Sequence, residues 1–209
     1  MRKHTNVCVM ESRWWHGKNT SIRSIYELIA DIHCDNPHKF EYEMINNQTG
    51  FAEILKRQLK NRDVNYIVIA AHGDENNLQL YNKETISRVL LRNTLKKDEY
   101  FNLAGLHFSS CSFMNENLAK FLYDTHYHIS PWWISGYGHE VDWIDSSAFE
   151  FIFFNKILMK DINNNHPSEI IGEVCDQLWK ECSGLIKKFK FQVFSIDKRN
   201  DLWSHFPYK

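Results

Sequence analysis

Short apolar runs alternate along the chain with stretches whose apolar residues recur at helical spacing. Two runs, 64–71 and 103–108, are almost continuously apolar and are bounded by polar residues. Runs of this kind are typical of parallel strands that helices cover on both faces. Shorter apolar or alternating patterns predict further strands at 6–10, 40–45, 132–135 and 189–193.

Apolar residues three or four positions apart predict helices between these strands. Ser21 or Thr20 can cap the first helix, and Pro37 blocks its extension. The segment 145–159 has phenylalanines that alternate as in a strand, but its length favours a helix. The other predicted helices lie at 22–32, 51–59, 84–95, 115–122 and 167–182.

The alternation of strands and helices predicts an α/β fold, in which helices cover both faces of a mostly parallel central sheet. No repeat, low-complexity linker or composition shift divides the chain, so residues 1–209 are expected to form a single domain. In open sheets of this kind, sites form at the carboxyl ends of the strands.

Charge and cysteine content narrow the class of protein. Lys and Arg number 25 against 26 Asp and Glu, so the chain lacks the overall basic field of a nucleic-acid-binding protein. No apolar run approaches the roughly 18 residues of a membrane span, and residues 1–10 are not expected to act as a secretory signal. Five cysteines without regular spacing indicate free thiols, and we expect a cytoplasmic protein.

No metal or organic cofactor is expected. Cys175 and Cys182 would share a helix face, but their spacing is not that of zinc ligands, and core packing explains them better. His126 and His128 are an equally weak metal signal. The segment 11–14, which follows the first strand, lacks the glycine-rich phosphate loop of a nucleotide-binding domain.

Two predicted strands end in residues that can catalyse acyl transfer. The strand at 64–71 runs into His72 and Gly73, and the strand at 103–108 runs into Cys111. If these strands are neighbours, their ends lie about 5 Å apart. A thiolate is a strong nucleophile, and imidazole can protonate a leaving amine near neutral pH. The backbone N–H groups of Gly73 and Cys111 can stabilise an oxyanion.

An apolar strand ending in His-Gly, followed by a second ending in a small residue and Cys, resembles the caspase-like cysteine peptidases. Three stretches carry the resemblance, the last of them to the strand and loop after the nucleophile in bacterial CHAT-type proteases: 66–73, 106–111 and 134–142. The resemblance covers about residues 5–160 and implies a caspase-like three-layer sandwich. It implies His72 as general acid/base, Cys111 as nucleophile and Gly73 in the oxyanion hole. Phe113 stands where many relatives have glycine.

Residues after the strand at 132–135 are candidates for substrate binding. The resemblance implies a basic residue before the scissile bond, which a carboxylate can bind strongly. We assign Asp142 and Asp145 to an acidic pocket, with Asp74 as a rival. Strand alternation would turn Trp133 toward a groove. Acidic loop residues are more often simply solvated, and Trp133 can equally belong to the core.

These features predict a cytoplasmic caspase-like cysteine endopeptidase that acts on a protein or peptide substrate. The resemblance further implies a switch, either an activating protein or a small nucleotide-type signal, and a role as an effector of bacterial antiviral defence. An alternative is the same fold with an inactive site that binds a protein partner or a nucleotide. Exposed phenylalanines within 149–154 would mark an interface in a homo-oligomer.

Overall fold

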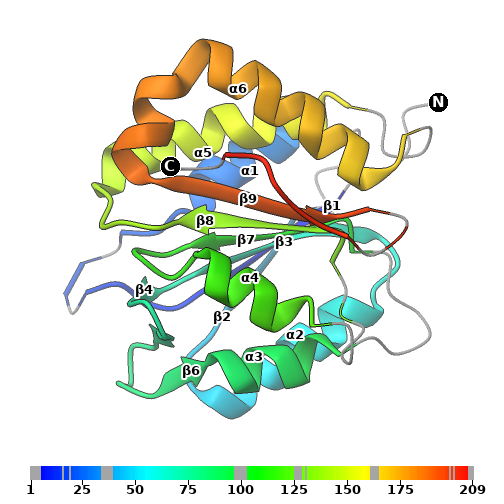
Figure 1. Cartoon of the computed structure of the whole chain (residues 1–209). Helices are drawn as coiled ribbons and strands as arrows, with labels where there is room; N and C mark the ends of the chain where they lie inside the picture. The colour runs from blue at the N-terminus through cyan, green and yellow to red at the C-terminus, as the bar shows by residue number, and fades with distance from the viewer. Residues whose placement is uncertain are drawn as a thin grey trace.

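A seven-stranded sheet lies between two layers of helices in the computed structural model of the chain (Figure 1). The structure describes residues 6–15, 17–18, 20–33, 40–96, 103–124, 129, 131–160, 165–197, 199 and 201–206. The strands of this sheet are β1 (Asn6–Glu11), β2 (Phe40–Met44), β3 (Val64–Ala70), β7 (Gly105–Ser109), β8 (Trp133–Tyr137), β9 (Phe191–Ile196) and β10 (Leu202–Ser204). Their spatial order is β10-β9-β8-β7-β3-β1-β2.

Most of the sheet is parallel. β1 pairs in parallel with β2 and with β3, β3 pairs with β7, and β7 pairs with β8. At the other edge β9 runs antiparallel to β8, and β10 runs antiparallel to β9. Because the parallel strands end at one edge of the sheet, the segments that follow β1, β3, β7 and β8 meet there.

Helices cover both faces of the sheet and bury a separate core on each side. They are α1 (Arg23–His33), α2 (Gln48–Lys60), α3 (Arg88–Leu95), α4 (Glu116–Leu122), α5 (Trp143–Leu158) and α6 (Pro167–Phe189). α1, α5 and α6 lie on one face, and α2, α3 and α4 lie on the other (Figure 1). Alternate residues of β3 enter the two cores: Val68 packs in one, and Ile67 and Ile69 pack in the other. The predicted three-layer α/β fold is confirmed.

A small second sheet stands where the sequence predicted part of a helix at 84–95. Its strands are β4 (His72–Gly73), β5 (Asn77–Gln79) and β6 (Thr85–Ser87). β6 pairs with β5 and buries Ile86, so helix α3 begins only at Arg88. The side chain of Ser87 caps that helix by accepting the N–H of Leu90. β-Sheet pairing thus overrides the helical pattern of the first residues.

The structure also tests the predicted end of β8 and the predicted helix that corresponds to α5. The strand extends beyond residue 135, where the sequence predicted its end, through Gly136 and Tyr137, because both residues pair with β9. The phenylalanine-rich segment forms helix α5, as its length favoured. Phe149, Phe153 and Phe154 are buried. They therefore belong to the core and are not available for an interface between copies.

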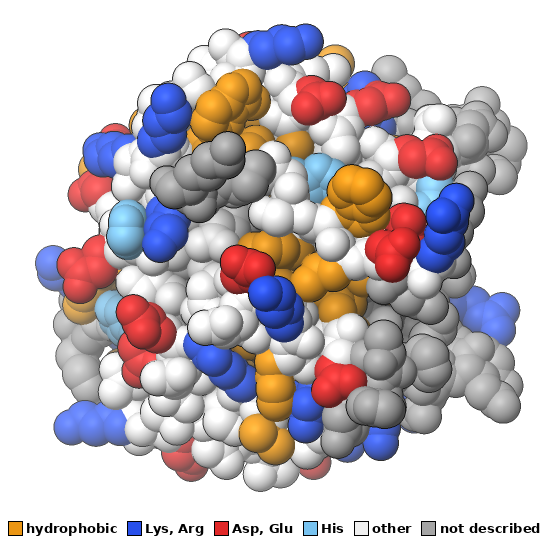
Figure 2. Space-filling model, viewed as in Figure 1, with side chains coloured by type: hydrophobic (Ala, Val, Ile, Leu, Met, Phe, Trp, Pro, Cys, Tyr) orange, Lys and Arg blue, Asp and Glu red, His pale blue; other side chains and the backbone are white. Residues whose placement is uncertain are grey.

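The described surface is of mixed charge. On the face shown in Figure 2, acidic and basic side chains are interspersed, with small groups of apolar side chains between them. No helix within the described ranges is both long and apolar enough to span a membrane. Pro37, Cys34, His126 and His128 lie outside the described residues.

Candidate active site

The loop after β3 and the loop after β7 are in direct contact. β3 and β7 are paired neighbours with Ala70 opposite Ser109, so His72 and Cys111 each follow the last pair by the same number of residues. A Cβ atom placed on Gly73 would lie only 2.7 Å from the carbonyl oxygen of Cys111. The His-Gly segment and the cysteine loop therefore pack against each other with no room between them.

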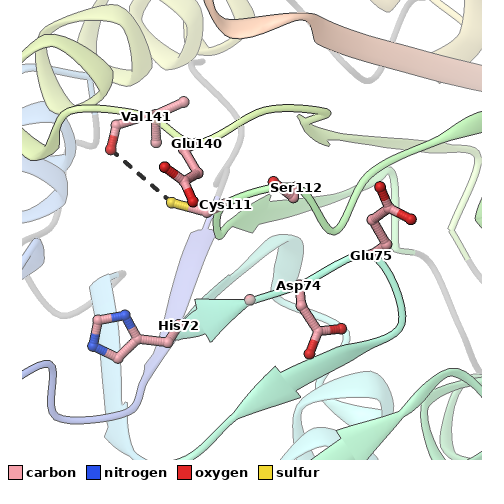
Figure 3. Close-up of a pocket in the computed structure, with 8 residues that line it drawn as sticks. His72, Asp74, Glu75, Cys111, Ser112, Glu140 and Val141 are labelled. Atoms are coloured by element: carbon pink, nitrogen blue, oxygen red, sulfur yellow. Dashed lines mark hydrogen bonds between the residues drawn. The ribbon is translucent and has the colours of Figure 1, made fainter.

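A pocket of about 410 Å³ opens where these two loops meet (Figure 3). Cys111 is half-buried on its wall, and His72 lies below it in the same opening. The lining residues are His72, Gly73, Asp74, Glu75, Cys111, Ser112, Glu140 and Val141. The structure thus brings the two predicted catalytic side chains into one pocket.

A backbone carbonyl fixes the tautomer of His72. Its Nε2 atom lies 2.9 Å from the carbonyl oxygen of Trp14, on the loop after β1. A carbonyl oxygen only accepts hydrogen bonds, so Nε2 carries the proton, and Nδ1 of the neutral ring is unprotonated. Figure 3 shows one ring nitrogen on the side nearer Cys111 and the other on the far side. Nδ1 is therefore the basic nitrogen of the neutral ring, and it lies on the side nearer Cys111.

Two tryptophans hold the imidazole from the side. The ring of Trp14 meets the ring of His72 edge-on, with centroids 5.2 Å apart, and Trp15 does the same at 6.0 Å. Trp14 thus contacts His72 through both its ring and its backbone. The sequence pattern did not assign either tryptophan to the site, because backbone contacts leave no signature in residue type.

The Cys111 thiol opens to the pocket, in contrast to the core cysteines. Its Sγ atom lies 4.0 Å from the carbonyl oxygen of Val141, a weak S–H···O contact (Figure 3). Burial raises the pKa of the Cys8 and Cys175 thiols well above the usual range, so both stay protonated. Cys175 belongs to the core, and Cys182 packs against that core, as the sequence indicated.

The N–H of Gly73 is available to a ligand. Asp74 donates its backbone N–H to the carbonyl of Asn77 at 3.0 Å, which makes these two residues a hydrogen-bonded pair. Gly73 lies opposite Leu78, at the next position of the same antiparallel ladder. Hydrogen-bonded and non-bonded pairs alternate in such a ladder, so the N–H of Gly73 points away from β5.

The turn at Cys111 offers a second donor. Ser112 has a left-handed φ of 56° and donates its N–H to the carbonyl of His139. The N–H of Cys111 has no acceptor among the described residues. Phe113 packs its ring against Phe108 in the core, with centroids 5.0 Å apart. The turn therefore accommodates a large side chain at the position where many caspase-like peptidases have glycine.

Replacement of Gly73 by alanine is expected to lower kcat/KM on the order of 100-fold for any reaction that uses both loops, the effect of misplacing a reacting group by about 1 Å. The new Cβ would lie 2.7 Å from the carbonyl oxygen of Cys111 and 3.1 Å from Cβ of Ser110, so one loop must move. Gly184→Ala is the matched control, because a Cβ there meets nothing within 4 Å. Wild-type kcat/KM in Gly73→Ala would contradict the close contact of the two loops.

A second pocket, of about 440 Å³, shares His72, Cys111 and Val141 with the first. Its lining combines aromatic side chains with serines: Trp14, Trp15, Ile22, His72, Ser109, Ser110, Cys111, Val141, Asp142, Trp143, Ser146 and Ser147. It lies among the segments that follow β1, β3, β7 and β8.

Serine hydroxyls of this second pocket are oriented as acceptors. Ser109 donates its hydroxyl hydrogen to Oε1 of Glu150 at 2.7 Å, and Ser146 donates to the carbonyl of Trp143 at 3.2 Å. Each oxygen therefore has only lone pairs left for a ligand. The Ser110 hydroxyl is buried and has no hydrogen-bond partner in the described part of the chain. These groups favour a ligand rich in hydrogen-bond donors.

A buried carboxylate lies beneath the pocket at Glu150. Tyr26 and Tyr137 donate to it at 2.9 and 3.0 Å, and Nε2 of His107 lies 3.2 Å from Oε1. Burial by itself raises the pKa of Glu150, but the charge of His107 and the surrounding hydrogen bonds outweigh it and lower that pKa. Glu150 is therefore ionised. No pattern in the sequence pointed to Glu150, because its partners come from three other elements, α1, β7 and β8.

Asp142 is the acidic residue that the structure brings to the second pocket. Its Oδ1 atom also accepts the N–H groups of Ile144 and Asp145 at 2.9 and 3.1 Å and so caps α5. The assignment of Asp145 to the pocket is wrong, since its carboxylate pairs with Lys188 at 2.6 Å and lines neither pocket. Asp74 lines the first pocket.

The assignment of Trp133 to a groove is also wrong. Trp133 is 1% exposed and packs against Tyr66 and Phe153. Its indole fills the space above Gly105, where a Cβ would lie 2.0 Å from the ring. The sheet is covered on both faces, so alternation along β8 turns side chains toward one core or the other.

A solved protease has a similar backbone. The X-ray structure of a secreted C11 cysteine protease from Bacteroides thetaiotaomicron, in complex with an irreversible peptide inhibitor, matches 92% of this chain with a TM-score of 0.52 and 10% sequence identity. The chain covers 66% of that protein's length, just under two thirds. No family model and no curated protein matches the sequence. The comparison confirms the caspase-like fold that the sequence resemblance implied.

Proposed function

We propose that the protein is a cysteine endopeptidase with His72 and Cys111 as its catalytic dyad. Nδ1 of His72 takes the thiol proton, and the sulfur attacks the peptide carbonyl carbon to form a tetrahedral oxyanion. The imidazolium then gives this proton to the leaving amine as the C–N bond breaks. Water, deprotonated by His72, hydrolyses the thioester, which releases a carboxylate and restores the thiol.

One observation carries this proposal: the His-Gly segment and the cysteine loop touch, and both catalytic side chains line the same pocket. The carbonyl of Trp14 sets the tautomer that the first proton transfer needs. The N–H groups of Gly73 and Cys111 are free to stabilise the oxyanion. The caspase-like fold supports the same reading.

We further propose that a basic substrate residue, just before the scissile bond, enters the second pocket. Asp142 supplies a carboxylate there, and Ser109 and Ser146 supply oriented acceptors. The indole rings of Trp14 and Trp143 suit the apolar stem of Arg or Lys.

Asp142→Asn is expected to lower kcat/KM for substrates with Arg or Lys at this position about 10- to 100-fold, the worth of a hydrogen bond to a charged group. Cleavage of matched substrates with a neutral residue should change little. Asn caps helices as well as Asp does, so the melting temperature should be nearly unchanged. The measurement is kcat/KM across a peptide series that varies only at this residue.

Asp145→Asn is the matched control for Asp142→Asn. It removes a charge three residues away, but from an exposed pair with Lys188. We expect the same residue preference as the wild type and little change in stability, since exposed ion pairs contribute little. An equal loss of basic preference in both variants would contradict the assignment of Asp142 to the pocket.

The finer parts of the function rest on the sequence resemblance. They are a place among CHAT-type proteases, activation by a protein or nucleotide-type signal, and a role in antiviral defence. The cytoplasmic location rests instead on the irregularly spaced cysteines. Cleavage assays with and without candidate activators, together with growth assays of cells that express wild-type or Cys111→Ala protein, test the activation and the role in defence. Constant full activity without any addition would contradict the switch.

A peptide acyloxymethyl ketone that ends in Arg tests the dyad directly, because it alkylates an activated thiolate. We expect one label per chain, on Cys111, with labelling greatly reduced in His72→Ala. Peptide mapping by mass spectrometry identifies the labelled cysteine. Equal labelling in both proteins, or labelling spread over other cysteines, would instead favour an inactive module that binds a partner or nucleotide.

A further inference from the structure

Glu11, the last residue of β1, is a buried carboxylate to which the proposed mechanism gives no role. It is 1% exposed. An ionised side chain in such a place is strongly destabilising unless donors surround it. The loop after β1 supplies most of those donors, and this same loop carries the Trp14 carbonyl that holds His72.

Each oxygen of Glu11 has two donors. Oε1 accepts from Nε1 of Trp14 at 2.6 Å and from the N–H of Ile22 at 3.0 Å. Oε2 accepts from the Tyr42 hydroxyl at 2.6 Å and from the Ser21 hydroxyl. Burial and the hydrogen bond to Glu11 raise the pKa of Tyr42 to about 12, so this phenol donates at neutral pH. The two arms of the carboxylate thus hold different partners.

Only the Oε1 arm leads to the catalytic histidine. Trp14 binds Glu11 through its indole N–H and binds Nε2 of His72 through its carbonyl oxygen. Its ring also stands edge-on to the imidazole. Fixing the indole therefore fixes both the acceptor for Nε2 and the wall beside the ring. Tyr42 and Ser21, on the Oε2 arm, hold the start of α1 and β2.

We propose that Glu11 is a positioning residue for His72, and that it acts through Trp14. The inference rests on the proposed dyad. Glu11 lines neither pocket, so it does not touch the substrate. Its carboxylate keeps Trp14 where the carbonyl accepts from Nε2, which presents Nδ1 to Cys111. If Glu11 were purely structural, loss of a hydrogen bond to either Oε1 or Oε2 would lower stability. Variants with the same melting temperature would then show the same His72 behaviour.

Three variants separate these two roles. Trp14→Phe keeps the backbone carbonyl and an aromatic ring but removes the donor to Oε1. Glu11→Gln keeps the shape of the side chain but replaces one acceptor with a donor. Tyr42→Phe is the matched control, because it removes a hydrogen bond of equal length from Oε2. Thermal melting of each variant reports the fold.

The main readout needs no substrate. The rate of Cys111 alkylation by iodoacetamide, followed by peptide mapping from about pH 5 to pH 9, reports how well a neighbouring imidazole promotes the thiolate. His72→Ala defines the part of the profile that depends on His72. The other titratable side chains of the two pockets are Asp74, Glu75, Glu140 and Asp142, and all are retained in every variant.

We expect Trp14→Phe and Glu11→Gln to lower the His72-dependent alkylation rate at neutral pH about 3- to 10-fold, the worth of one hydrogen bond. Tyr42→Phe should keep the wild-type profile even where its melting temperature falls as far. With a peptide substrate, Glu11→Gln should lower kcat and leave KM within about twofold.

Wild-type profiles in Trp14→Phe and Glu11→Gln would overturn the inference. So would an equal change in Tyr42→Phe, which would make the effect one of stability alone. If Glu11→Gln does not fold, comparison of Trp14→Phe with Tyr42→Phe still separates a positioning role from a structural one. If His72→Ala leaves the pH profile of Cys111 alkylation unchanged, the dyad itself is overturned. That outcome differs from one in which His72→Ala changes the profile and the Glu11 and Trp14 variants do not.

Discussion

Cys111→Ala is expected to abolish peptide cleavage, with kcat lowered about 10,000-fold or more, because the thiolate that forms the acyl-enzyme is removed. His72→Ala should lower kcat about 100-fold or more, the usual worth of a general acid/base. The double variant should be no worse than Cys111→Ala, since the two side chains act in one step. The measurement is steady-state cleavage of a peptide with Arg before the scissile bond.

Cys182→Ala is the control for loss of a cysteine. Cys182 is half-buried on α6 and lines neither pocket. Its removal should leave kcat within about twofold of the wild type, since packing changes at such a site are small. Cleavage at the wild-type rate by Cys111→Ala would refute the proposed nucleophile, whatever the other variants do.

Glu150→Ala is expected to destabilise the protein by about 3–5 kcal/mol, the usual cost of breaking a buried ionic network by removing one member. Ser109, Tyr26 and Tyr137 would each lose a buried acceptor, and His107 would lose its charged neighbour. Denaturant unfolding followed by tryptophan fluorescence measures the change.

A surface glutamate is the control for Glu150. Glu181 pairs with Lys156 at 2.6 Å, but its own side chain is 55% exposed. Glu181→Ala should change the free energy of unfolding by about 0–1 kcal/mol. A similar small change in Glu150→Ala would show that the buried network contributes little to stability.

The stability that Glu150 contributes should also depend on pH. Its pKa in the folded protein lies below the ordinary value of 4.5, so the folded state binds this proton less readily than the unfolded state does. The contribution is therefore fully present above about pH 4.5 and is lost as pH falls through the folded pKa. Relative to Glu150→Gln, the wild type should lose more stability on acidification. Parallel pH profiles would contradict this.

The sequence predicted most of the fold because the dominant signal was burial. The run Val64–Ala70 is apolar on both faces, which only a strand between two helical layers satisfies. Helices with local caps, such as the one that begins after Asn115, were predicted equally well from the sequence. The start of α3 was missed because β6 pairs with β5, six to ten residues earlier in the chain, and helical spacing of apolar residues does not record that pairing.

In the candidate site too, some residues were predicted from local sequence patterns and others depend on the packing of the folded chain. His72, Gly73 and Cys111 stand at strand ends, and their order along the chain is visible in the sequence. Trp133 and Asp145 were misplaced because residue type does not tell which face of a covered strand or which side of a helix cap points to a pocket. Trp133 packs in the core, and Asp145 pairs with Lys188.

The amino-acid sequence alone determined the α/β class and the two reactive residues at strand ends, because periodicity and residue type record burial and chemical capacity. Only the tertiary structure decided which groups support them. The Trp14 carbonyl lies 58 positions from His72, and Glu11 binds Tyr42 across 31 positions. Such contacts follow from the order of strands in the sheet, which brings the ends of β1, β3, β7 and β8 together and which no local pattern encodes.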